Sequence, residues 1–135
     1  MRNLFALCLC LAALQATAAT FQDLQEQYGA QARQDNPAFD GFSSTRGKSF
    51  YEAKRTMGSD KQSGCFDCHT ADPAQPGKTH ANKSIGPMAI SANPKRFTDL
   101  KKSEKWFRRN CTDLLGRPCT AQEKGDFIEF LAHYK

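Results

Sequence analysis

The stretch that decides the fold is SGCFDCHT, residues 63–70, in which Cys65, Cys68 and His69 form the pattern C-x-x-C-H. Two thiols on one turn of chain can form thioethers with the two vinyl groups of one porphyrin, and the adjacent imidazole then lies under the iron. The pattern therefore predicts one covalently bound haem c, with His69 as the proximal iron ligand. A thioredoxin-like redox pair would need a βαβ setting, and a zinc site would need a second ligand pair; the sequence offers neither.

The residues around this motif support the same interpretation. From residue 58 to 94 the chain is mostly loop, which is too long to be structureless in a small domain unless something else organises it. A large apolar macrocycle would supply the missing core. The sequence thus predicts an all-α, small class I cytochrome c-like fold wrapped around one covalent haem, with an extra N-terminal helix.

Helical patterns dominate the rest, and strand signal is negligible. Four helices are expected, over residues 21–33 (capped by Thr20), 45–56, 99–110 (capped by Thr98) and 121–134 (with a Thr120–Glu123 capping box). Gly47 in the second would let an aromatic ring of the last approach closely, so we expect these two helices to cross, with Tyr51 and Phe130 in contact.

The first 18 residues, MRNLFALCLCLAALQATA, read as a cleaved secretory signal peptide. A basic Arg2 precedes a short apolar run, which ends in small residues; an uncleaved anchor helix would need a longer run. Cys8 and Cys10 would leave with it. We therefore expect a signal peptide at 1–18, an N-terminal helix and linker at 19–43, a cytochrome c domain at 44–135, and a periplasmic location.

The charge is mildly basic and scattered. The chain has 19 Lys and Arg against 14 Asp and Glu, a formal net charge of +5. This balance suits transient docking to an acidic protein face but lacks the dense basic stripe of a nucleic-acid binder, so no nucleic-acid partner is expected. The candidates for a docking face, all on loops, are Lys78, Lys83, Lys95 and Arg96.

The ligand opposite His69 decides between electron transfer and ligand binding. Met88 is the usual choice in an electron-transfer cytochrome, but it follows His69 by only 19 positions. His80 lies among polar loop residues and His133 near a helix end, so both are expected at the surface. On a helical wheel Asn110 falls in the same arc as Phe107, so an inward amide that needs a partner is one reading; a helix C-cap is the other.

Three segments, NPKRFTD (93–99), EKWFRRNC (104–111) and LGRPCTAQEKGDF (115–127), resemble the SHP-type cytochromes c, small exported single-haem proteins. The likeness extends over residues 44 to 134. It implies that Asn110 is a distal iron ligand which leaves on reduction, and that Cys111 and Cys119 form a disulfide.

The same resemblance implies that the ferrous haem binds small diatomics such as oxygen or nitric oxide. Its implied electron donors are a dihaem cytochrome c and a membrane cytochrome b. No distal acid–base histidine pair is visible, so an electron-transfer or ligand-binding haem protein is expected rather than a dedicated enzyme. The alternative is a plain electron-transfer cytochrome with Met88 as the permanent sixth ligand.

Overall fold

The computed structural model describes residues 19–56 and 62–135. The predicted signal peptide, residues 1–18, lies outside the described residues. The described chain is mostly helical, and its helices are α1 (Phe21–Asp35), α2 (Ser44–Glu52), α3 (Cys65–His69), α4 (Leu100–Leu115) and α5 (Ala121–Ala132). In these residues no helix is long and apolar enough to cross a membrane.

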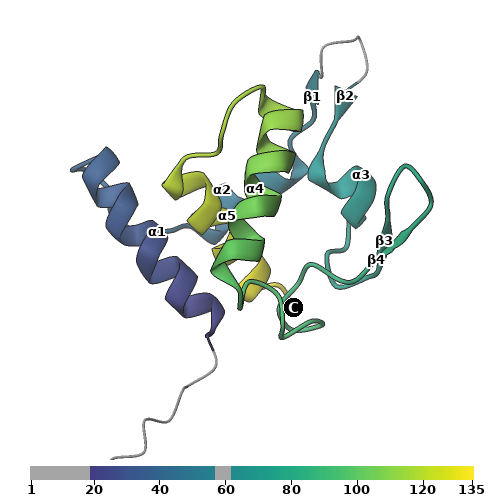
Figure 1. Ribbon diagram of the computed structural model, residues 1–135, viewed down its shortest axis with the longest axis horizontal. Coiled ribbons are helices and arrows are strands. Elements are labelled where there is room, and N and C mark those ends of the chain that lie inside the picture. Colours follow the sequence, from purple (N-terminus) through teal and green to yellow (C-terminus); the bar gives the residue numbers. More distant parts are fainter. Residues whose placement is uncertain (1–18, 57–61) are drawn as a thin grey trace, which may run out of the picture.

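Two small antiparallel hairpins, which the sequence did not predict, flank α3. One pairs β1 (Arg55–Thr56) with β2 (Gln62–Ser63), and the other pairs β3 (Gly77–Lys78) with β4 (Ser84–Ile85). The predicted second helix was too long for this reason: it ends at Glu52, and the residues expected in its last turn pair in β1. Figure 1 shows α1 on one side of α4, with α3 and the β3–β4 hairpin on the other.

The predicted crossing of α2 and α5 is confirmed. A Cβ atom added to Gly47 would lie 1.9 Å from the backbone oxygen of Asp126, so only glycine allows this approach. Tyr51 is fully buried there, and its ring centroid lies 5.6 Å from that of Phe130. The Asp126 carboxylate accepts hydrogen bonds from the Arg46 guanidinium, which ties α5 to the first turn of α2.

The ends of α4 differ from the prediction. The N-cap is Asp99, whose side chain accepts from the amide of Lys102 at 2.9 Å, whereas the Thr98 hydroxyl donates to the carbonyl of Lys95. The helix then continues past Asn110 to Leu115 and ends at Gly116, which adopts the left-handed conformation (φ +68°). The longer helix carries Asn110 in its body rather than at its end.

The N-terminal helix is part of the packed structure. The Tyr28 hydroxyl donates to Glu104 of α4 at 2.6 Å, and Lys124 of α5 donates to both oxygens of the same carboxylate at 2.9 Å. The Tyr28 ring also meets Phe107 edge-on. This group of contacts joins α1, α4 and α5 where they meet.

Candidate functional site

Helix α3 presents the C-x-x-C-H motif on a single turn. The Asp67 side chain accepts from the amide of Gly64 at 2.8 Å and from the hydroxyl of Ser63 at 3.0 Å, which stabilises the start of the helix. Cys65 and Cys68 are three positions apart and therefore share one face of the turn. Both are free thiols, so they are not paired with each other.

The end of α3 is fixed from two sides. The buried hydroxyl of Tyr51 donates to the carbonyl oxygens of His69, at 3.1 Å, and of Thr70, at 2.7 Å. From the other side Gly77 approaches so closely that an added Cβ atom would lie 1.9 Å from the carbonyl oxygen of Cys68. Thr70 itself adopts a positive φ of 66°, which turns the chain sharply away from the helix. The backbone that carries His69 is therefore held in one orientation.

Burial sets the chemical state of the motif. It raises the pKa of the Cys65 thiol to about 11. A reactive redox dithiol needs a lowered pKa, so this environment argues against a thioredoxin-like pair. Burial also lowers the pKa of His69 to about 4, with the positive charge of Arg96 acting in the same direction. The imidazole is neutral at pH 7, which is the form that ligates a metal.

His69 has an unused nitrogen. Within residues 19–56 and 62–135, its Nδ1 is the one buried side-chain nitrogen or oxygen atom without a hydrogen-bond partner. A half-buried imidazole with an enclosed, unsatisfied nitrogen fits a group that supplies a metal. No group of three or more His, Cys, Asp or Glu in these residues could hold an ion by itself, so the metal would have to come with a cofactor such as haem.

The segment with Met88 is hydrogen-bonded to the chain that follows His69. Its backbone amide and that of Ala89 both donate to the carbonyl of Pro73, four residues after His69, at 2.8 Å each. Pro73 is fully buried, and Met88 is 7% exposed. The loop with Met88 is thus fastened to the chain that leaves His69.

The two remaining histidines lie at the surface, as expected. His80 is exposed, with its Nε2 4.0 Å from Sγ of Cys68. His133 follows the last residue of α5, and its Nδ1 lies 3.0 Å from the carbonyl oxygen of Glu129.

Asn110 lies near the middle of α4. The C-cap interpretation is wrong, because the helix continues for five more residues. The expectation of an amide turned into the protein core is also wrong: the buried stripe of α4 consists of Ser103, Phe107 and Cys111, and Asn110 is exposed at its edge. Its side chain forms no hydrogen bond with any described residue. Among the described residues nothing takes up this amide, which lies beside the buried stripe.

Two large apolar side chains on the same helix are exposed. They are Leu100, at 38%, and Trp106, at 44%, and Trp106 lies one turn before Asn110. Leu100 is the first residue of the helix. Apolar surface beside an amide that has no partner among the described residues fits contact with a large apolar cofactor.

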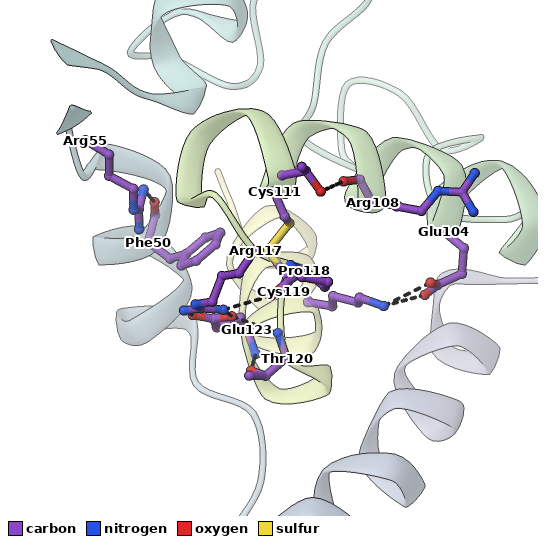
Figure 2. The surroundings of a disulfide bond; sticks show 12 residues. Phe50, Arg55, Glu104, Arg108, Cys111, Arg117, Pro118, Cys119, Thr120 and Glu123 are labelled. Carbon is purple, nitrogen blue, oxygen red and sulfur yellow. Dashed lines mark hydrogen bonds and ion pairs between the residues drawn. A yellow bond between two sulfur atoms is a disulfide. The ribbon is translucent and has the colours of Figure 1, made fainter. Parts of the chain in front are cut away.

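The predicted disulfide is confirmed. Cys111 of α4 is bonded to Cys119, immediately before the N-cap of α5, with 5.5 Å between the Cα atoms. Both cysteines are buried. Figure 2 shows Arg117 reaching across this loop to Glu123; the two side chains form a two-pronged ion pair with distances of 2.8 and 2.7 Å. The loop is therefore closed by a covalent bond and by an ion pair.

The cap of α5 completes this closure. Glu123 also accepts from the amide of Thr120, and the Thr120 hydroxyl accepts from the amide of Glu123, so the predicted capping box is confirmed. Arg117 is the main cause of the lowered pKa of Glu123.

The predicted docking residues divide into two groups. Lys78, Lys83 and Lys95 are exposed, as expected of solvated charges. Arg96 is half-buried instead, and its guanidinium donates to the carbonyl oxygens of Pro87 and Gly86. Sequence reasoning missed this, because a lone arginine in a polar loop carries no local signal of whether its side chain points inward or outward.

A haem-attachment motif on a fixed turn, a half-buried neutral histidine and a loop-rich helical shell define a small c-type cytochrome with one haem. The comparisons agree with this class. Residues 37–131 match the family model described as a domain of unknown function, DUF1924. The cytochrome c-type protein SHP of Cereibacter sphaeroides is 42% identical over 87 residues, which cover 64% of this chain and 67% of that protein. Cytochrome c'' of Methylophilus methylotrophus is 40% identical over 111 residues, covering 82% of this chain and 77% of that protein.

Solved structures of the same two proteins share the fold. Oxidised SHP, described as an oxygen-binding cytochrome c, superposes with a TM-score of 0.75 at 35% identity, covering 86% of this chain and 98% of the other. The solution structure of cytochrome c'' is described as giving insights into the structural basis of haem-ligand detachment. It superposes with a TM-score of 0.75 at 38% identity, covering 85% of this chain and 94% of the other. The chain belongs to the SHP and cytochrome c'' group of monohaem cytochromes c, the DUF1924 family. Its cofactor is one covalent haem c.

Proposed function

We propose that this protein is an exported electron-transfer cytochrome whose distal ligand, Asn110, leaves on reduction and opens the haem to a small molecule such as oxygen or nitric oxide. The observation that carries the proposal is the amide of Asn110 on α4, which forms no hydrogen bond with the described residues and lies next to the disulfide-bonded Cys111. In this proposal Cys65 and Cys68 hold the haem and His69 is the proximal ligand. The haem supplies the electron acceptor and the place where the small molecule binds.

The chemistry of the asparagine side chain supports redox-dependent release. An amide oxygen is a hard, neutral and weak donor, which suits ferric iron better than the softer ferrous iron. Reduction therefore shifts the population from a closed to an open site. SHP is described as an oxygen-binding cytochrome c, and the solution structure of cytochrome c'' is described in terms of haem-ligand detachment. Both descriptions agree with an iron site that opens on reduction.

The position of Met88 argues against the alternative, a plain electron carrier with a permanent methionine ligand. Its backbone is fastened to Pro73, on the chain that leaves His69, whereas a sixth ligand must approach from the opposite face of the haem. A thioether would also hold ferrous iron well and keep the site closed.

The disulfide gives Asn110 a fixed support. It joins the turn of α4 next to Asn110 to the start of α5, so the side chain can move away from the iron while its backbone stays in place. For the electron donors, we propose a dihaem cytochrome c or a membrane cytochrome b in the same compartment, the periplasm. The exposed Lys78, Lys83 and Lys95 suit transient docking to an acidic surface.

The decisive experiment is the Asn110→Ala variant. The haem should remain attached, and the ferric protein should bind azide at least about tenfold faster than the wild type, because no protein ligand has to leave first. Asn93→Ala is the matched control: it removes another amide, which is bonded to the carbonyl of Pro87. Wild-type ferric spectra and azide kinetics in Asn110→Ala would overturn the assignment of Asn110.

A further inference from the structure

Arg96 is a cation held in place without a counter-charge. Its Nε donates to the carbonyl of Pro87 at 2.8 Å and its Nη2 donates to the carbonyl of Gly86 at 2.5 Å. Five of the six ion pairs formed by the described residues involve other Lys and Arg side chains and the sixth involves His133, so no carboxylate in this part of the chain pairs with Arg96. Burial lowers its pKa, and no acidic side chain offsets this effect.

A half-buried charge without an opposite charge is costly, so it calls for an explanation. Neutral carbonyl oxygens satisfy two of the three guanidinium nitrogens, but they do not neutralise the charge. The third nitrogen, Nη1, forms no hydrogen bond with any described residue. An arginine with one free nitrogen and two fixed ones is a pre-oriented donor for a carboxylate.

The place of Arg96 in the fold points to the haem. Its guanidinium holds the carbonyl of Pro87, and the amide of Met88, the neighbour of Pro87, donates to the carbonyl of Pro73, four residues after His69. The next residue, Phe97, stacks on Phe107 of α4 with 6.2 Å between ring centroids, and Phe107 lies one turn before Asn110. The loop with Arg96 therefore connects the proximal segment to the helix that carries Asn110.

Haem brings two carboxylates of its own. The vinyl groups used by Cys65 and Cys68 and the two propionates occupy opposite halves of the porphyrin, so the propionates point away from α3. They are anionic at pH 7 and need partners where protein surrounds them. Among the described residues, two half-buried guanidiniums have no carboxylate partner. Arg55 donates to Phe50 and Ala53 on the chain that enters the C-x-x-C-H motif, whereas Arg96 lies on the loop before α4 and is the one placed away from the thiols along the chain.

The geometry points to Arg96 as a binding residue for a haem propionate, with Gly86 and Pro87 holding its guanidinium in position. The inference rests on the covalent haem and is independent of Asn110. Its functional consequence is electrostatic: a positive charge close to the haem favours the reduced state, and it is poorly screened because it is half-buried. Arg96 would thereby raise the reduction potential.

The test uses the full holoprotein and three variants: Arg96→Gln, Arg96→Lys and Lys95→Gln. Lys95→Gln is the matched control, because it removes the same charge from the neighbouring exposed position. Two quantities are measured for each variant: the midpoint potential, by spectroelectrochemical titration, and the frequency of the propionate bending mode, by resonance Raman spectroscopy. If Arg96 had only a structural role, the variants would change neither the midpoint potential nor the propionate frequency.

Arg96→Gln should shift the equilibrium between ferric and ferrous protein about tenfold toward ferric, which is 59 mV for one electron. It should also shift the propionate mode. Arg96→Lys keeps the charge but loses the paired donors of the guanidinium. The equilibrium between ferric and ferrous protein should therefore stay within about twofold of the wild type, while the propionate mode should still shift. Lys95→Gln should leave both nearly unchanged.

An unchanged propionate mode in both Arg96 variants would overturn the inference, as would equal potential shifts in Arg96→Gln and Lys95→Gln. If Arg96→Gln fails to fold, the propionate mode of Arg96→Lys still decides. Asn110→Ala separates this inference from the proposed function: that variant should change azide binding and leave the propionate mode as in the wild type.

Discussion

The backbone amide of Met88 donates a hydrogen bond to the carbonyl of Pro73, with 2.8 Å between N and O. This bond fastens a buried methionine to the chain that leaves His69. We expect Met88→Leu to keep the wild-type ferric and ferrous spectra, because the change conserves volume in a core position and removes no iron ligand. The cost in unfolding free energy should stay below about 1.5 kcal/mol.

Absorption and magnetic circular dichroism spectra of both redox states check this prediction. If Met88 were a ligand, the wild type would show a thioether-to-iron charge-transfer band, and Met88→Leu would lose it. Ile90→Leu is the control, since it alters a nearby apolar side chain that packs on the same core.

The disulfide between Cys111 and Cys119 should affect both stability and ligand release. Replacing both cysteines with serine should lower the unfolding free energy by about 2–3 kcal/mol, as expected for a short closed loop. It should also raise the rate of ferric azide binding several-fold, because the turn of α4 beside Asn110 loses its support.

The control for that variant is Arg117→Met, which breaks the ion pair to Glu123 but keeps the disulfide. It should cost no more than about 1 kcal/mol, because the pair is partly exposed. Azide binding at the wild-type rate in the double serine variant would show that the disulfide has no part in holding Asn110.

Tyr51 holds the end of α3 by its hydroxyl. Tyr51→Phe leaves the carbonyls of His69 and Thr70 without this donor, so we expect a loss of about 1–3 kcal/mol in unfolding free energy. The environment of the haem should also change, which would appear as a shift in the Soret band or in the midpoint potential. Tyr28→Phe removes a hydroxyl bonded to Glu104, far along the chain from α3, and should lower stability without a spectral change.

Gly47 should tolerate no side chain. In Gly47→Ala the new methyl group would lie 1.9 Å from the backbone oxygen of Asp126 and 2.8 Å from Cβ of Phe130, so α2 and α5 would have to separate. We expect a loss of about 3 kcal/mol or more, measured by denaturant unfolding. Gly86→Ala meets nothing closer than 3.5 Å, at the Asn93 side chain, and should change stability by less than about 1 kcal/mol.

Much of the fold could be predicted because local signals and the haem motif agree. The C-x-x-C-H pattern required a haem-centred core, and the Thr20 and Thr120 caps fixed where α1 and α5 begin. The end of α4 could not be predicted as well. Asn110 and Gly116 are both residue types that can end a helix, and only the folded structure shows that the chain remains helical to Leu115.

The site was predictable in its covalent parts and less so in its surroundings. Cys65, Cys68 and His69 form a local motif, whereas Tyr51, Pro73 and Gly77 reach α3 from elsewhere in the chain and carry no local signal. The wheel placed Asn110 near the buried stripe but could not tell a core position from its edge. Arg96 looked like a surface charge, because only the folded loop brings the carbonyls of Gly86 and Pro87 to it.

The contact between Gly47 and Asp126 also constrains the order of events as the chain is made. A protein that emerges with its N-terminus first presents residues 65–69 well before α5, which lies at the far end of the sequence. The partner of α2 is then still missing, so the crossing that encloses Tyr51 and completes the core cannot form. The two thiols therefore have an interval in which they are synthesised but not yet enclosed, and covalent loading of the cofactor can precede the final closure of the fold.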